Sequence, residues 1–249
     1  MKIGILDSGI GGLTVLRECL KQIPNHEYLY FADSKNAPYG IKSRAEVYEL
    51  TENAVRYLLA EGAEIIVIAC NTATSAAAQQ LREKYDVPMI GMEPAVKPAL
   101  KQAAGKRVLV TATELTLKEG KFLNLTRELD ERSVIDLCPL GRLVRFAEAG
   151  EFSDEKVLPY LEERFQEFDL SLYRSVVLGC THFPLFRSAF EKILPSDVTL
   201  IDSSGGTVNR MKDFITVTSE NPSVRLFLSG VPLEEGERFD LMWSILKSE

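Results

Sequence analysis

Residues 65–74, IIVIACNTAT, and residues 175–184, SVVLGCTHFP, share one organisation. Each begins with an apolar, largely β-branched run and continues through a small residue, Ala69 or Gly179, to a cysteine, Cys70 or Cys180. A hydroxyl or amide side chain and the expected start of a helix follow. In open α/β sheets, ligands bind just outside the carboxyl ends of the strands. The two segments therefore predict both cysteines at positions where chemistry normally occurs.

The paired segments belong to a longer internal repeat. Aligning KIGILDSG (2–9) with KRVLVTAT (106–113) gives an offset of 104 residues, and aligning Cys70 with Cys180 gives an offset of 110. In both halves short apolar runs alternate with longer helical patterns, which predicts parallel sheets with helices on their faces. We expect an α/β fold of two pseudo-symmetric parallel-sheet domains with the active site in the cleft between them, formed by residues 1–95 plus 206–249 and by residues 96–205.

Individual elements can be placed from these patterns. Strands are predicted at residues 3–6, 28–32, 65–69, 89–91, 107–111, 134–137, 176–178 and 198–201, and helices at about 13–22, 44–61, 74–85, 95–104, 116–131 and 153–167. The charged run 148–167 is interpreted as a solvated helical face. The tail GVPLEEGERFDLMWSILKSE, residues 230–249, is expected to serve domain packing.

Composition and charge limit the classes of function. The chain has 249 residues, 45% of them hydrophobic, and a formal net charge of −7, the wrong sign for a general binder of nucleic acid or anionic membranes. Its start has no signal-peptide pattern, and no apolar run approaches about 18 residues. None of the four cysteines forms a C-x-x-C motif, which argues against a structural zinc site or a thioredoxin-like centre. We expect a cytoplasmic small-molecule enzyme with reduced thiols.

The two matched cysteines indicate proton transfer. A thiol at the first turn of a helix sees the positive end of the helix dipole, which favours the thiolate. Two such groups facing each other across a cleft could remove a proton from one side of a carbon acid and return one from the other. This chemistry inverts a stereocentre without a cofactor. Two other interpretations stay open: a Cys–His hydrolase using Cys180 and His182, and a metal site formed by Cys70, Cys180 and His182.

The first strand leads into DSGIGG, residues 7–12. Its glycines allow a tight turn and close backbone approach, and its N–H groups could hold a carboxylate. The segment lacks the lysine of a Walker loop, and its spacing does not match the dinucleotide fingerprint.

Simpler structural interpretations of several residues stay open. Asp7 could cap the following helix, and Tyr39 and Gly40 could form an ordinary turn. Cys19 and Cys138 are expected to be packing residues.

Six segments together resemble one known family. They are GILDSGIGGLTVL (4–16), FADSKNAPYG (31–40), IACNTAT (68–74), GMEPAV (91–96), LGCTHFPL (178–185) and LIDSS (200–204). In order and spacing they resemble the cofactor-independent glutamate racemases of the aspartate/glutamate racemase superfamily. The resemblance implies two pseudo-symmetric α/β domains, with the C-terminal segment returning to the first.

The same resemblance implies roles for individual residues. Cys70 and Cys180 correspond to the paired proton donor and acceptor, assisted by Asp7 and His182 respectively. Glu148 is a further candidate, ten residues after Cys138 in CPLGRLVRFAEAGE. No metal ligand is implied. The substrate-binding positions are Asp7, Ser8, Tyr39, Gly40, Asn71, Thr72, Thr113, Thr116, Thr181 and His182.

One segment departs from the family pattern. After the strand at 107–111, TATELTLKEGKF keeps Thr113 and Thr116 but has Ala112, Glu119 and Phe122 where the family has other residues. This difference leaves room for a substrate other than glutamate.

The activity implied by the resemblance is interconversion of L- and D-glutamate without pyridoxal phosphate, which would supply D-glutamate for the bacterial cell wall. A homodimer is also implied, with no nucleic-acid or membrane partner. The alternatives are a racemase of aspartate or another acidic amino acid, and a weakly active paralogue that binds an amino acid as a regulator.

Overall fold

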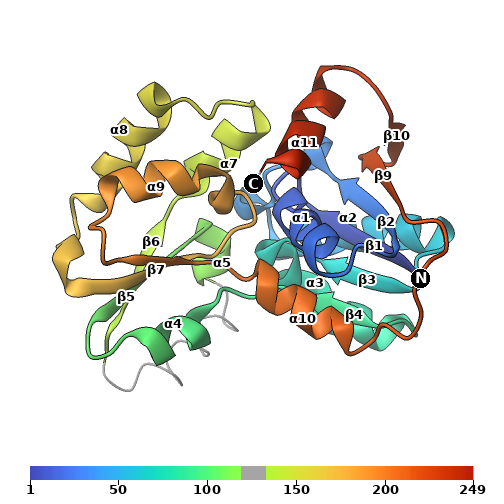
Figure 1. The fold of residues 1–249 in the computed structure, drawn as a ribbon, viewed down its shortest axis with the longest axis horizontal. Coiled ribbons are helices and arrows are strands. Elements are labelled where there is room, and N and C mark those ends of the chain that lie inside the picture. The colour runs from blue at the N-terminus through green and yellow to red at the C-terminus, as the bar shows by residue number, and fades with distance from the viewer. Residues whose placement is uncertain (119–132, 249) are drawn as a thin grey trace.

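The computed structural model describes residues 1–118 and 133–248. Within these residues the chain forms two sheets, one in each of two lobes that lie side by side (Figure 1). Each sheet is built from parallel strands, apart from one antiparallel edge strand in the first. The predicted fold class, two parallel-sheet α/β domains, is confirmed.

The sheet of the first lobe has the strand order β10-β9-β2-β1-β3-β4 in the described residues. Its centre is β1, whose residues after Lys2 are all buried. A strand buried on both faces requires helices above and below it, as parallel sheets usually have. The strands are β1 (Lys2–Asp7), β2 (Glu27–Ala32), β3 (Ile65–Ile68), β4 (Met89–Gly91), β9 (Ser223–Leu228) and β10 (Val231–Leu233).

Two groups of helices cover the first sheet. Helices α1 (Leu13–Gln22), α10 (Ser204–Lys212) and α11 (Glu237–Lys247) pack on the face that carries Ile3 and Ile5. Helices α2 (Arg44–Ala60) and α3 (Asn71–Lys84) pack on the face that carries Leu6. The short 3-10 helices η1 (Ser34–Asn36) and η2 (Tyr39–Ile41) lie between β2 and α2.

The sheet of the second lobe has the order β6-β5-β7-β8. Its strands are β5 (Arg107–Ala112), β6 (Ile135–Pro139), β7 (Tyr173–Leu178) and β8 (Thr199–Ile201). One face packs against α7 (Gly141–Glu148), α8 (Asp154–Phe165) and α9 (Arg187–Ile193), and the other against α4 (Val96–Gln102) and α5 (Glu114–Lys118). The 3-10 helices η3 (Leu170–Leu172) and η4 (Phe183–Phe186) flank β7. One apolar cluster contains both Ile3 and Leu109, so the cores of the two lobes are continuous.

The chain crosses between the lobes twice, after β4 and after β8. The two crossings lie together, because the Ser203 hydroxyl donates a hydrogen bond of 2.6 Å to the Glu93 carbonyl oxygen. The predicted domain boundary between residues 95 and 96 lies at the first crossing, whereas the one between residues 205 and 206 lies within α10.

Most predicted strands and helices are present, with shifted ends. Helix α3 begins at Asn71, three residues before the predicted start, because Cys70 caps it by accepting a hydrogen bond from Ala73 N. The helix predicted at 116–131 begins as α5, and residues 119–131 lie outside the described residues. The helix predicted at 153–167 is present as α8 (Asp154–Phe165), with exposed acidic side chains as a solvated face requires, but the charged run over 148–167 is not helical throughout. The run is broken by Gly150, which has a φ of 70°, and α8 begins only at Asp154.

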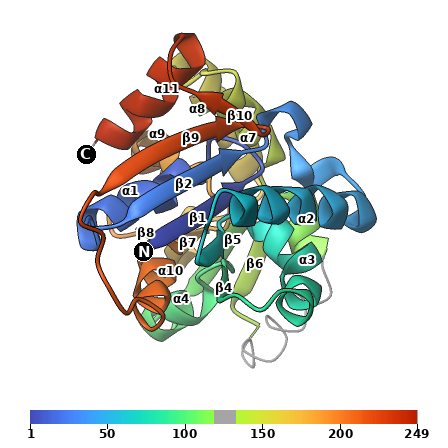
Figure 2. The same ribbon diagram turned by 90° about the vertical axis from the view of Figure 1, so that its right-hand side faces the viewer.

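The C-terminal segment returns to the first sheet. Strand β9 pairs in parallel with β2, with Tyr30 opposite Leu226, and extends the sheet by one strand (Figure 2). Helix α11 then packs on α1, with Met242 and Ile245 buried in the apolar cluster. The tail of residues 230–249 does serve packing, as expected, but it also supplies β10 and α11, and neither these elements nor the preceding β9 were predicted from periodicity.

The buried ring of Phe227 tests how strongly the returning strand is held. This side chain is fully buried on β9, and its ring centroid lies 5.2 Å from that of Tyr57. We expect Phe227→Ala to lower the free energy of unfolding by about 3–5 kcal/mol, because it removes a buried ring and leaves a cavity. Urea unfolding checks the value, and Val231→Ala on the exposed edge strand is the control. A loss below about 1 kcal/mol for Phe227→Ala would show that the returning strand contributes little.

Candidate active site

The loop after β1 lies directly against the second lobe. A Cβ atom on Gly9 would lie 1.8 Å from Glu148 Oε1, and one on Gly11 would lie 2.4 Å from His182 Nδ1. No other residue type fits at either position, because any side chain would overlap these groups. The glycines of DSGIGG therefore bring the backbone of one lobe into contact with polar side chains of the other.

The N–H groups of this loop hold carboxylates, and in this structure those carboxylates are the protein's own. Ile10 N donates to Glu148 Oε1 at 2.7 Å, and Gly9 N donates to Asp7 Oδ1 at 3.0 Å. The alternative that Asp7 caps the next helix is wrong, since α1 has Gly12 at its N-cap and no side-chain cap.

Cys70 lies at the carboxyl end of β3, where it caps α3. Its Sγ accepts a hydrogen bond from Ala73 N at 3.4 Å, and its thiol donates to Ser8 Oγ at 3.6 Å. Burial, together with the negative charge of Asp7, raises the pKa of Cys70 to about 12. The lowering of a thiol pKa that a helix N-terminus favours is therefore not realised at Cys70. Desolvation outweighs the helix dipole, and Cys70 is a thiol.

Cys180 lies at the carboxyl end of β7 in the second lobe, the counterpart of Cys70. Its Sγ is 3.7 Å from Nδ1 of His182, and both residues are buried. On the other side of the ring, His182 Nε2 lies 2.8 Å from Glu148 Oε1. Burial alone would lower the pKa of His182, but the hydrogen bonds with Cys180 and Glu148 outweigh burial and hold that pKa well above its ordinary value. His182 is thus a cation beside the Cys180 sulfur.

Glu148 connects the two lobes. Besides Ile10 N and the His182 ring, its carboxylate accepts hydrogen bonds from Ser34 Oγ, at 3.0 Å, and from Arg238 Nη2. Arg238, on α11, also donates to the Glu148 carbonyl oxygen at 2.7 Å and to Ser34 Oγ at 2.8 Å. Burial would raise the pKa of Glu148, but the bond to His182, the N–H of Ile10 and the Arg238 charge lower it to about 2. Glu148 is therefore ionised throughout the neutral range.

Asp7 interacts with the surroundings of both cysteines. Its Oδ2 accepts a hydrogen bond of 3.0 Å from Thr181 Oγ1, next to Cys180, and its charge acts on Cys70. Burial raises the pKa of Asp7 to about 6, although the His182 cation and the bonds from Gly9 and Thr181 work in the opposite direction. A carboxyl group with this pKa can gain and lose a proton near neutral pH.

Three of the predicted substrate residues form a cluster of hydroxyl groups. The Oγ1 atoms of Thr72, Thr113 and Thr116 lie 3.0–3.1 Å from one another. Gly40 lies against this cluster, since a Cβ atom on it would lie 2.8 Å from the Cβ of Thr113. Ala112 is buried at the end of β5, whereas Glu119 and Phe122 lie outside the described residues.

Asn71 has the clearest unfilled hydrogen-bonding capacity. Its side-chain nitrogen and oxygen are both buried, and neither has a partner in the described part of the chain. A buried amide without partners costs on the order of 1–3 kcal/mol per group, so such groups need an explanation. Asn71 follows Cys70 directly, where a polar ligand could satisfy both atoms.

Tyr39 is buried, and its hydroxyl donates to Asp33 Oδ2 at 2.7 Å. Its hydroxyl is therefore used within the protein in this structure. Tyr39 and Gly40 belong to η2, a short helical turn that carries Gly40 to the threonine cluster.

Reactive groups outside this site are few. Cys19 and Cys138 are fully buried, and burial raises the pKa of Cys19 to about 12 and of Cys138 to about 11, as suits packing residues. Across residues 1–118 and 133–248, no three His, Cys, Asp or Glu side chains are grouped so that they could hold a metal ion. The same residues contain no helix with the length and apolar character needed to span a membrane.

The fold and the site together define an enzyme with a cysteine at the end of a central strand in each of two related α/β lobes. A family model described as Asp/Glu/Hydantoin racemase matches residues 3–211. The glutamate racemase of Campylobacter curvus is 50% identical over 217 residues, covering 85% of this chain and 82% of its own. Glutamate racemase 2 of Bacillus subtilis is 45% identical over 243 residues, covering 95% and 92%.

Solved structures give the same result. Escherichia coli glutamate racemase, in complex with L-glutamate and the activator UDP-MurNAc-ala, superposes with a TM-score of 0.86 at 27% identity, covering 99% of this chain and 94% of that one. The chain belongs to the Asp/Glu/hydantoin racemase family. It is an isomerase of the amino-acid racemase type.

Arg238 and Ser34 are parts of the site that sequence reasoning missed. Ser34 lies within the motif FADSKNAPYG, one of the segments that resemble the family, and this position could have marked it as a site residue. Nothing in that motif indicates a contact with Glu148. Arg238 lies in the tail expected to serve only packing, about 90 residues from its partner. No local pattern could predict that contact.

The raised pKa of Asp7 predicts a stability gain from removing its charge. The folded-state pKa, about 6, exceeds the ordinary value of 3.8, so the folded protein binds a proton more tightly than the unfolded chain does. The stability from this linkage is present below pH 3.8 and is lost as the pH rises through 6, a cost of about 3 kcal/mol. Asp7→Asn should avoid that cost. Urea unfolding at pH 4 to 8 should show a stability advantage for Asp7→Asn that grows up to about pH 6–7, whereas a constant difference would contradict the raised pKa.

Glu148 should affect the pH dependence of stability in the opposite direction to Asp7, because its pKa is lowered rather than raised. Glu148 has a lowered folded-state pKa, so its contribution to stability is present above its ordinary value of 4.5 and is lost as the pH falls toward about 2. Arg238→Gln removes one of the charges that lower this pKa, so the acid loss of stability should begin at a higher pH. The carboxyl resonance of Glu148 in an NMR titration gives the shift directly. Arg56→Gln, on an exposed arginine of α2, should leave the titration unchanged.

Proposed function

We propose that this enzyme interconverts L- and D-glutamate by proton transfer through two thiols, Cys70 and Cys180, without pyridoxal phosphate. The main support is the matched position of these residues at the carboxyl ends of β3 and β7, one in each lobe. They are close enough for the charge of Cys180 to raise the pKa of Cys70. A substrate held between two such groups can be approached from both faces of one carbon.

The surroundings of the two cysteines give them different starting forms. Cys70 has a pKa of about 12 and begins as the thiol. Cys180 lies 3.7 Å from the ring of the His182 cation, a positive charge that suits its sulfur to act as the base. Glu148 holds His182 in place through Nε2, and its negative charge keeps the ring protonated.

The reaction then proceeds in two proton transfers. The Cys180 thiolate takes the proton from Cα, so that the C–H bond breaks, an S–H bond forms and the electron pair stays on Cα as a carbanion. The S–H bond of Cys70 next breaks, and its proton bonds to Cα on the opposite face. The product has the inverted configuration, Cys70 is left as the thiolate and Cys180 as the thiol. The other enantiomer follows the same steps in reverse.

Asp7 assists on the Cys70 side. With a pKa of about 6, it can carry a proton near neutral pH beside a thiol that must gain and lose one. When Asp7 is protonated, its negative charge no longer disfavours the Cys70 thiolate, so its titration is coupled to that of the thiol.

The groups that lie beside the cysteines are suited to hold the ends of an acidic amino acid. The orphaned amide of Asn71 offers two donors and an acceptor, and Ser8 lies 3.6 Å from the Cys70 sulfur. The hydroxyl cluster of Thr72, Thr113 and Thr116 offers further donors for a carboxylate. Substrate binding would thus satisfy the Asn71 amide, which has no partner among the described residues.

A hydrolase is the less suitable alternative. The contacts on this side of the site resemble those of a cysteine hydrolase, with Cys180 as the nucleophile, His182 as the base and Glu148 as the carboxylate that orients the base. That assignment leaves Cys70 and its contact with Ser8 unexplained. The named relatives favour glutamate over aspartate as the substrate, which the assay below decides.

The cellular role we propose is the supply of D-glutamate for peptidoglycan, by a homodimer in the cytoplasm. Complementation of a bacterial strain that requires D-glutamate should succeed with the wild-type gene and fail with a Cys70→Ser gene. Light scattering of the purified protein tests the dimer.

The activity itself is tested by incubating each glutamate enantiomer with the protein in deuterated buffer. Optical rotation should fall toward zero while deuterium enters at Cα. Cys70→Ser and Cys180→Ser should each reduce the rate by at least about 100-fold, the usual effect of losing a proton-transfer group. Cys19→Ser and Cys138→Ser, which change thiols outside the site, should not cause such losses when compared as folded proteins. Near wild-type activity in either site variant would contradict the two-thiol mechanism, and turnover of aspartate alone would correct the substrate. Binding of glutamate without any turnover would favour the regulator.

A further inference from the structure

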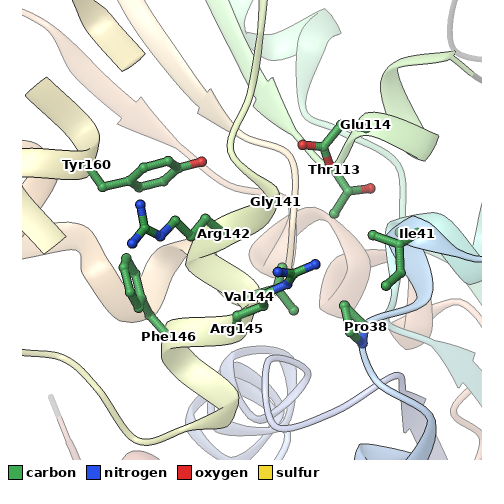
Figure 3. Close-up of a pocket in the computed structure, with 11 residues that line it drawn as sticks. Pro38, Ile41, Thr113, Glu114, Gly141, Arg142, Val144, Arg145, Phe146 and Tyr160 are labelled. Atoms are coloured by element: carbon green, nitrogen blue, oxygen red, sulfur yellow. The ribbon is translucent and has the colours of Figure 1, made fainter. Parts of the chain in front are cut away.

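A cavity of about 460 Å³ lies between the two lobes beside the candidate active site (Figure 3). The first lobe contributes Gly40 and Ile41 of η2 to its wall. The second lobe contributes Thr113 and Glu114 at the start of α5, together with residues of α7 and α8. We call this cavity the vestibule. Its volume is in the range of small-molecule sites.

The vestibule adjoins the groups predicted to hold the substrate. Thr113 lines it, and Thr113 Oγ1 lies 3.1 Å from that of Thr72, two residues after Cys70. Gly40, also in the wall, lies against Thr113. Cys70 and Cys180 are only 5% and 8% exposed, so a ligand must come from a neighbouring space to reach them. The vestibule is such a space.

Among the residues that the structure describes, the charged groups in the vestibule wall are Arg142, Arg145 and Glu114. The Arg142 guanidinium is held over two rings, 5.2 Å from the centroid of Phe146 and 5.5 Å from that of Tyr160. Figure 3 shows Arg145 extending from α7 toward Ile41 and Glu114 lying close to Gly141. A Cβ atom on Gly141 would indeed lie 2.4 Å from a Glu114 oxygen.

Neither arginine has an acidic partner among the residues that the structure describes. Within residues 1–118 and 133–248, no salt bridge joins Arg142 or Arg145 to a carboxylate, whereas Arg107, Arg225 and Arg238 all have acidic partners. The chain as a whole carries a net charge of −7. Two guanidinium groups without an ion pair in the described part of the chain, at the wall of one cavity, therefore stand out against an acidic protein.

We propose that the vestibule is a capture site in which an amino dicarboxylate binds before it moves to the cysteines. The charges match in number and sign: two guanidinium groups face two carboxylates, and the Glu114 carboxylate faces one ammonium group. Guanidinium groups bind carboxylates through paired hydrogen bonds, which suits arginine for this task. The site also resolves how an acidic protein attracts an acidic substrate, since a local positive field raises the rate of encounter.

This inference rests on the proposed glutamate racemase activity, and kinetics can test it separately. Arg142→Gln, Arg145→Gln and the double variant are compared with wild type for racemisation of glutamate at several salt concentrations. We expect the double variant to raise KM and lower kcat/KM by about 10-fold at low salt, with kcat within about twofold of wild type, because the groups that carry out the chemistry are untouched. The salt dependence of kcat/KM should become flatter, since screening then has less attraction to remove.

Two controls separate capture from a merely structural effect. The double variant Arg142→Lys, Arg145→Lys keeps both charges but loses the paired hydrogen bonds, so it should restore the salt dependence and part of the lost kcat/KM. Arg56→Gln removes a remote exposed charge and should change neither KM nor its salt dependence. If the wild-type enzyme racemises glutamate and the double Gln variant shows unchanged KM and salt dependence, the capture role of the vestibule is contradicted while the proposed function stands. An equal loss in the Lys and Gln double variants would also overturn the capture role. A wild-type protein that does not racemise glutamate would overturn the proposed function and the capture site with it.

Discussion

The geometry of the site depends on one carboxylate, that of Glu148. It belongs to the second lobe, but it accepts hydrogen bonds from Ile10 N and Ser34 in the first lobe and from Arg238 on the returning helix. The same carboxylate holds His182, which in turn stands beside Cys180. An ionised group this well buried must be fully paired, because an unpaired one would cost several kcal/mol. Pairing Glu148 therefore fixes how closely the lobes meet and where the Cys180 side of the site lies.

The two sides of the site are alike in position but different in charge. Each cysteine follows a central strand, yet Cys180 faces a cation and Cys70 faces Asp7, a carboxyl group with a pKa near 6. This asymmetry is what a two-base reaction requires, because one group must begin with a proton and the other without. The buried charge of Asp7 and the unpaired amide of Asn71 both cost stability in the free protein. Such costs are usual where a protein is organised around a ligand.

The sequence was informative wherever short-range patterns carried the signal. The repeated strand–small–cysteine segments predicted two α/β lobes and located both cysteines, because strand ends and helix starts are local features. The glycines after Asp7 were correctly expected to allow close approach, but what approaches them, Glu148 and His182, depends on the second lobe. Arg238 could not be predicted at all, since a contact between residues about 90 positions apart leaves no local pattern. Which of the two cysteines holds the proton could not be predicted for a related reason: the desolvation that raises the pKa of Cys70 depends on the whole fold, and it outweighs the helix dipole.

The central claim is that Cys70 and Cys180 act on one carbon from opposite faces. It is tested most directly by a crystal structure of the wild-type enzyme with glutamate bound. The account predicts the Cα of the ligand between the two sulfur atoms, one on each face, with the ligand carboxylates on Asn71 and the threonine cluster. A ligand whose Cα lies near only one sulfur, or one bonded covalently to Cys180, would contradict it.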